Sequence, residues 1–172
     1  MAQKQQAIIY IENENKTEAE FMSRSFVKKE VKNRAYINAL GAELASKYLA
    51  SEGIDTTETH NLHSISKILE KIDVADIMLP NIHIDVRVVF DENQIFIPKS
   101  HAILGIEPDI YLAMKLSPDF KFVEFLGYFE PARINKNKQN SDYYFIEKEK
   151  LSSPEKLTQY IKNFTGNTDK GI

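Results

Sequence analysis

The chain has 172 residues, of which 42% are hydrophobic and 10% aromatic, and this is the composition of one ordinary globular domain rather than of a disordered chain. Its formal net charge of −3 disfavours a protein that coats nucleic acid, and its lack of cysteine excludes disulfides, thiolate metal sites and cysteine nucleophiles. No apolar run approaches the roughly 20 residues that span a bilayer, and no export signal precedes the first polar residues, so we expect a cytoplasmic protein without membrane contact.

The order of hydrophobic patterns predicts one domain with a tail at each end. We expect residues 1–16 to form an N-terminal tail or a short edge strand, and residues 17–164 to form a single α/β domain. Residues 165–172 are expected to be a flexible C-terminal tail.

Helical spacing dominates the first part of the chain. Thr17–Glu20 has the form of a capping box, in which a hydroxyl and a carboxylate satisfy free backbone amides at a helix start. Apolar residues then recur every three or four positions over 21–49, which predicts a helix that stops at Gly53, or two helices broken near Lys32. A shorter helix is predicted over Ser64–Ile72.

The middle of the chain changes to the two-residue period of strands. Apolar residues alternate with His83, Asp85 and Arg87 over 82–89, which predicts a strand with one apolar face. Residues 90–94 are typical of a hairpin turn that leads to a returning strand. The returning strand and the others that we predict lie at 95–97, 110–116, 122–129 and, at an edge, 143–146.

The chain is expected to end in a helix that Ser152 or Ser153 caps, with Pro154 in the first turn where its missing N–H costs nothing. The order helix, helix, an antiparallel run of about four strands, then helix predicts an α/β (α+β) fold. In this fold, helices cover a small mixed sheet of about four or five strands.

One set of polar residues on separate elements could carry chemistry. Glu43 lies on the long helix, Asp85 in the middle of the first strand, and Lys99 at the end of the next strand. Carboxylates and a lysine in this arrangement could hold Mg²⁺ and orient an attacking water. The alternative is that Asp85 is a solvated residue or forms a salt bridge with Lys99 or with a neighbouring Arg87.

Four stretches resemble the core of the PD-(D/E)XK nuclease superfamily: 84–86, 95–99, 108–114 and 125–128. The resemblance implies a restriction-endonuclease-like fold with Asp85 as first acid and metal ligand, Lys99 as the lysine and Glu43 as an auxiliary acid. Ile97 occupies the position of the acid in Glu-x-Lys, so the resemblance is to a degenerate core. If the missing acid has migrated, Glu92 or Asp76 would replace it.

A second resemblance covers roughly 34–164. The helical stretch 35–49, the sequence Asp73–Leu79, Ile97-Pro98, and the strands at 110–114 and 125–128 are similar to DUF1822, an uncharacterised family widespread in cyanobacteria. This resemblance implies a bacterial protein and brings no established activity.

The sequence therefore predicts a non-catalytic binding or interaction module on a nuclease-like scaffold, without a cofactor and with nucleic acid or another protein as its partner. One alternative is a divergent Mg²⁺-dependent nuclease. The other is a protein- or small-molecule-binding regulator on an unrelated α+β fold.

Overall fold

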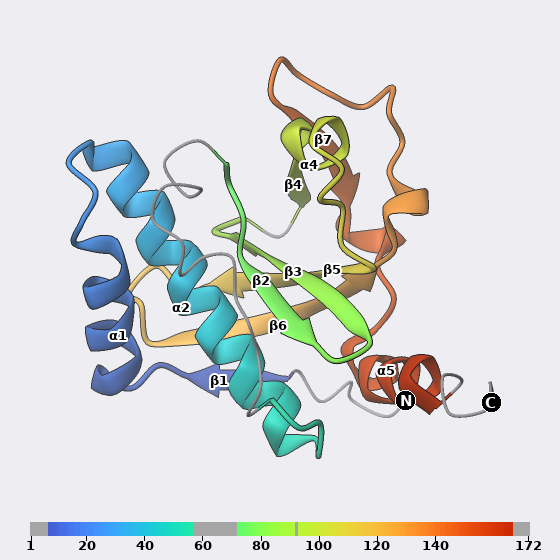
Figure 1. Cartoon of the computed structure of the whole chain (residues 1–172), viewed down its shortest axis with the longest axis horizontal. Helices are drawn as coiled ribbons and strands as arrows, with labels where there is room; N and C mark the ends of the chain where they lie inside the picture. Colours follow the sequence, from blue (N-terminus) through green and yellow to red (C-terminus); the bar gives the residue numbers. More distant parts are fainter. Residues whose placement is uncertain (1–6, 57–71, 92, 167–172) are drawn as a thin grey trace.

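A computed structural model describes residues 7–56, 72–91 and 93–166, and it shows helices together with two β-sheets (Figure 1). The predicted helix over Ser64–Ile72 falls almost entirely outside these ranges, as does Glu92. The helices are α1 (Asn13–Ser23), α2 (Lys29–Ser51), α4 (Lys99–Ile103) and α5 (Leu157–Gly166). The strands are β1 (Ile8–Tyr10), β2 (Asp76–Leu79), β3 (Ile82–Val89), β4 (Gln94–Pro98), β5 (Ile110–Leu116), β6 (Phe122–Phe129) and β7 (Tyr143–Glu147).

The main sheet has five strands in the order β1-β6-β5-β3-β2, and β4 and β7 form a separate two-stranded sheet. β3 and β5 run parallel, whereas the other neighbours in the main sheet are antiparallel. The predicted mixed α+β fold is confirmed. The expectation that the strands form one antiparallel run is wrong, because the chain between β3 and β5 leaves the sheet and returns through β4 and α4.

The predicted hairpin at residues 90–94 does not form. Both edges of β3 are already paired: Asp85 lies opposite Asp76 of β2 and opposite Tyr111 of β5. β4 therefore pairs antiparallel with β7 in the second sheet. The real hairpin joins β2 to β3 through Pro80 and Asn81, and the sequence analysis did not recognise β2 as a strand.

The N-terminal helices also begin and break at places that differ from the predicted ones. α1 begins at Asn13, where the backbone N–H of Glu12 donates to Asn15 Oδ1 at 3.0 Å. Thr17 lies inside this helix, and its hydroxyl donates to the carbonyl oxygen of Asn13 at 2.9 Å instead of capping a helix start. The break falls between Ser23 and Lys29, not at Lys32.

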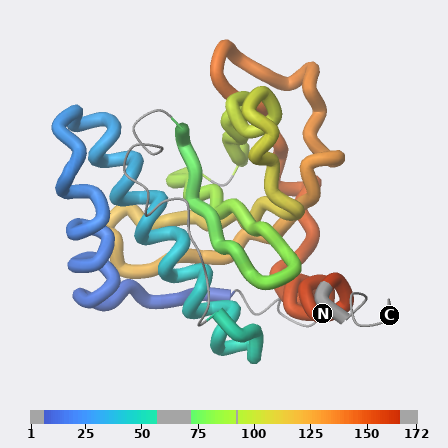
Figure 2. Tube along the Cα trace, in the orientation of Figure 1, coloured from blue at the N-terminus to red at the C-terminus, as the bar shows by residue number. Residues whose placement is uncertain are grey.

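Two apolar clusters place the main sheet between a helical layer and the small sheet. On one face, side chains of α2 pack against β3 and β5, as predicted; the buried residues are Leu40, Leu44, Leu49, Ile84, Val86, Ile110, Leu112 and Met114. On the other face, Ile95, Ile97 and Ile146 pack against Tyr111 and Phe129. Figure 2 traces α1 and α2 beside the main sheet and the strands β4 and β7 as a separate unit.

Gly41 allows α2 to lie unusually close to β3. A Cβ atom at this position would lie 2.5 Å from Val88 Cγ2, which is closer than two carbon atoms approach without a shift. The absence of a side chain therefore sets how deeply α2 packs on the sheet near the carboxyl end of β3.

Leu44→Ala should lower the free energy of unfolding by about 2–5 kcal/mol, because it leaves a cavity in the helix-facing core. Leu44 is 0% exposed. Urea unfolding measures the change, and Val27→Ala is the control, since Val27 is 98% exposed. Equal midpoints for the two variants would contradict the packing described above.

Candidate functional site

A buried ion pair occupies the face of β3 that points away from α2. Asp85 is 0% exposed and Arg87 is 5% exposed. Asp85 Oδ1 lies 2.5 Å from Arg87 Nε, an ion-pair contact without the alignment of a hydrogen bond. Because an isolated charge in a protein interior is strongly disfavoured, each of the two charges needs the other as its counter-charge there.

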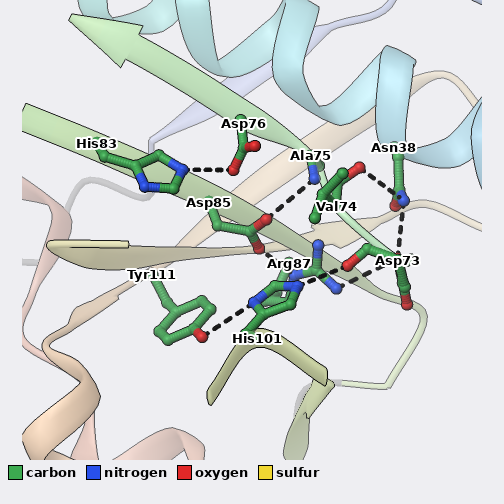
Figure 3. Close-up of polar contacts among 10 residues, drawn as sticks. All are labelled: Asn38, Asp73, Val74, Ala75, Asp76, His83, Asp85, Arg87, His101 and Tyr111. Atoms are coloured by element: carbon green, nitrogen blue, oxygen red, sulfur yellow. Dashed lines mark hydrogen bonds and ion pairs between the residues drawn. The ribbon is translucent and has the colours of Figure 1, made fainter. Parts of the chain in front are cut away.

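The ion pair also fixes the segment that leads into β2. Asp85 Oδ2 accepts a hydrogen bond from the backbone N–H of Ala75 at 3.0 Å (Figure 3). The N–H of Val86 donates to the carbonyl oxygen of Ala75 at 2.9 Å. Ala75 is thus held to β3 through both of its backbone polar groups.

Two further elements hold the same segment from other directions. Asn38 of α2 donates through Nδ2 to Asp73 Oδ1 at 2.8 Å and to the carbonyl oxygen of Val74 at 3.0 Å. Arg87 Nη1 lies 3.3 Å from Asp73 Oδ1. The carboxylate of Asp73 therefore joins helix α2 to the ion pair on β3, as Figure 3 shows.

His101 of α4 connects the segment to β5. Its Nε2 lies 2.7 Å from the carbonyl oxygen of Asp73, and its Nδ1 lies 3.0 Å from the hydroxyl of Tyr111. A carbonyl oxygen only accepts, so Nε2 carries a proton, and in the tautomer protonated at Nε2 alone Nδ1 accepts a hydrogen bond from the Tyr111 hydroxyl. Burial, and then the charge of Asp85, raises the pKa of Tyr111 well above its ordinary value, so this hydroxyl remains a donor.

The charges in the cluster stabilise one another. Burial alone would raise the pKa of Asp73, but Arg87, Asn38 and Arg34 outweigh it, so the pKa is lowered. Burial likewise opposes the charge on Arg87, and the carboxylates of Asp85 and Asp73 more than compensate, so the pKa of Arg87 is raised. Asp85 differs, because burial outweighs the opposing charge of Arg87 and the pKa of its carboxyl is raised.

A second acid on the same face belongs to a separate contact. Asp76, paired with Asp85 across β2 and β3, is 1% exposed and its Oδ1 lies 2.6 Å from His83 Nε2. Burial lowers the pKa of His83, but the hydrogen bond and the charge of Asp76 outweigh it, so the pKa is raised. The other oxygen of Asp76 has no hydrogen-bond partner within the described ranges.

The candidate residues from the sequence lie in different surroundings. Asp85 contacts Arg87 and Ala75. Lys99 begins α4 rather than ending a strand, and its Nζ donates to the carbonyl oxygen of Asn140 at 2.5 Å. Glu43 lies in the helical layer and accepts from Asn15 Nδ2 at 3.3 Å. No hydrogen bond or ion pair joins these three candidates to one another among the described residues.

The surroundings of Asp85 do not fit Mg²⁺, the metal that the nuclease resemblance implies. One carboxylate oxygen faces a guanidinium and the other accepts a backbone N–H. Mg²⁺ needs several oxygen ligands, and both oxygens of Asp85 are already engaged by these two groups. Over residues 7–56, 72–91 and 93–166, no three His, Asp or Glu side chains are placed to hold a metal. Ile97, at the position of the missing acid, is 1% exposed and packs in the apolar core.

A pocket of about 700 Å³ lies over the Asp73–Arg87 side of this cluster, at the carboxyl end of β3. Polar residues from the cluster and from α2 line part of it: Asn33, Arg34, Asn38, Asp73 and Arg87. Aromatic and aliphatic side chains from α2, β3, β4, β7 and the β5–β6 turn line the rest: Tyr36, Ile37, Val88, Val89, Phe90, Phe96, Phe120 and Tyr143.

The sequence analysis did not assign Asp73, His101 or Tyr111 to the site. The alternation of His83, Asp85 and Arg87 was a visible signal, because charged residues alternating along a covered strand must find buried partners. No signal identified His101, since α4 has only five residues and shows no readable helical period.

The fold and the cluster define an α+β protein with a mixed five-stranded sheet, a buried charge network and an adjoining pocket. The chain belongs to the family described as Protein of unknown function (DUF1822), whose model matches residues 9–165. The family that the sequence motifs indicated is thereby confirmed. No curated protein and no solved structure matches the chain significantly, and the nuclease-like core stays a prediction. None of the described helices is long and apolar enough to cross a membrane.

Asp85→Ala should destabilise the fold by about 3–5 kcal/mol, because it leaves Arg87 buried without its main counter-charge and frees the N–H of Ala75. Chemical denaturation measures the loss. Asp119→Ala is the control, since Asp119 pairs with Lys121 at the surface, and its effect should be far smaller.

Replacing both partners by apolar residues, as in Asp85→Leu with Arg87→Met, should cost less than Asp85→Ala alone, because no guanidinium is then buried without Asp85, and Asp73 keeps its hydrogen bond from Asn38. A double variant less stable than the single one would argue against the ion pair as the source of the effect.

Proposed function

We propose that the protein is a non-catalytic binding module that holds a small molecule in the pocket at the carboxyl end of β3. The observation that carries this proposal is the make-up of the pocket, in which Asp73 and Arg87 of the buried charge cluster lie beside the exposed ring of Phe90. A few fixed polar groups next to aromatic side chains in a concave site are typical of small-molecule pockets.

The position of the pocket supports the same proposal. β3 and β5 are the parallel pair of the main sheet, and the pocket is lined by the end of β3 and by Phe120, which follows β5. Ligands of sheets with parallel strands commonly bind beyond the carboxyl ends of those strands. Its volume of about 700 Å³ is within the usual range for small-molecule sites.

The polar side of the pocket is also held rigidly before any ligand arrives. Asp73 is fixed by Asn38 and Arg87, and Arg87 is fixed in turn by Asp85. A preorganised site loses little conformational entropy on binding, which favours affinity. The few polar groups at one end and the apolar side chains around them give the composition expected of a ligand site.

A ligand should perturb this pocket in a measurable way. In a screen of small polar aromatic fragments by ¹H–¹⁵N NMR on the whole chain, we expect binding fragments to shift the amide signals of residue 73 and of residues 87–90. Phe90→Ala should weaken those fragments about three- to tenfold, because Phe90 lines the pocket and is 53% exposed.

Phe164→Ala is the matched control, since Phe164 lies on α5 away from the pocket and is 37% exposed. Fragments that shift no pocket amide, or that bind Phe90→Ala as well as the unchanged chain, would contradict the proposal.

The Mg²⁺-dependent nuclease is the alternative that this proposal competes with. The contacts of Asp85 with Arg87 and Ala75 speak against metal binding there. We therefore expect no cleavage of single- or double-stranded DNA by the purified protein in Mg²⁺ or Mn²⁺, measured by gel electrophoresis. Cleavage that Asp85→Asn abolishes would overturn the non-catalytic proposal.

A further inference from the structure

Resting on the proposed function, we infer that the pocket takes a planar heteroaromatic ring with N–H donors along one edge, of the kind found in aminopurines and aminopyrimidines. Three features of the pocket carry this inference: two groups of aromatic side chains, hydrogen-bond acceptors at the polar end, and a balanced set of charges.

The aromatic side chains form two groups that come from different parts of the fold. Tyr36, Phe120 and Phe90 make one continuous row, with ring centroids 6.4 Å apart for the first pair and 6.1 Å for the second. Phe96 of β4 and Tyr143 of β7 make the other group, with centroids 6.0 Å apart. Rings contributed by several separate elements favour a flat ligand, because every aromatic ring can stack on a planar face.

The polar end of the pocket presents acceptors. Asn38 uses both hydrogens of its amide nitrogen on Asp73 Oδ1 and on the carbonyl oxygen of Val74, which leaves its own carbonyl oxygen without a partner in the described chain. Asp73 receives its contacts from Asn38 and Arg87 at Oδ1, so Oδ2 is a second open acceptor. Two acceptors on neighbouring residues match a ligand edge that carries two N–H donors.

The charges around the pocket do not favour a phosphate. Arg34 and Arg87 are the cations that line it, and Arg87 already pairs with Asp85 and Asp73. Asp73 lines the pocket beside these cations and would repel an anion that approached the open acceptors. An uncharged ring that donates hydrogen bonds keeps this balance, whereas a phosphate would have to displace a buried ion pair.

The test is an NMR titration of the whole chain with guanosine, adenosine and cytidine, compared with caffeine and with pyrophosphate. Caffeine is a planar purine in which methyl groups replace the ring N–H donors. We expect at least one nucleoside to shift the pocket amides, caffeine to bind at least tenfold more weakly, and pyrophosphate to leave those signals unchanged.

Two variants connect the binding to these residues. Phe90→Ala should weaken the nucleoside about tenfold, and Phe164→Ala should leave it unchanged. Asp73→Asn should remove the preference for the nucleoside over caffeine, because an amide can present its NH₂ group where the carboxylate oxygen accepted. A melting temperature recorded for each variant separates loss of binding from loss of the fold.

The outcomes distinguish this inference from the function on which it rests. Caffeine or pyrophosphate bound in the pocket as tightly as a nucleoside would overturn the ligand class and leave the binding module in place. The same conclusion follows if fragments bind the pocket but none of the three nucleosides does. A pocket that binds neither fragments nor nucleosides would overturn both.

Discussion

The ion pair between Asp85 and Arg87 imposes a constraint that the surrounding structure has to satisfy. Both side chains lie on a strand that is covered on its two faces, so Asp85 is closed to water and Arg87 is nearly so. Ala75 donates its backbone N–H to Asp85, and the carboxylate of Asp73, which Asn38 of α2 holds in turn, contacts Arg87. The pair therefore connects β3 to the segment that enters β2 and, through Asp73, to α2. Apolar side chains pack on both faces of the same sheet.

Local patterns were enough to predict the elements of the core but not how the strands pair. The alternation over 82–89 and the spacing of Leu40, Leu44 and Leu49 reflect burial of one face, which a single element records in its own sequence. Whether β4 lies beside β3 depends on which edges of β3 are occupied, and this was hidden by the unrecognised strand β2. Pairing is a property of several segments at once.

In the candidate site, too, the sequence predicted a single residue but not the contacts that it makes. The sequence identified Asp85, because a carboxylate in the middle of an apolar strand is conspicuous. It could not tell a metal ligand from half of an ion pair, since that depends on which side chains the fold brings near. Asp73 and His101 are 12 and 16 residues away along the chain, on a segment and a short helix without distinctive patterns. Their roles emerge only from the contacts of Asp73 with Asn38 and Arg87 and from the contact of His101 with Tyr111.

Gly41 influences the shape of the pocket although it is not one of the residues that line it. Its missing side chain lets α2 rest on Val88, and Val88 is one of the residues that line the pocket on the other side of the contact. Any larger residue at 41 would have to lift the helix or turn Val88 aside, and either response alters the shape of the pocket. A single buried substitution at this position would thus reshape the pocket while every residue that lines it stays the same.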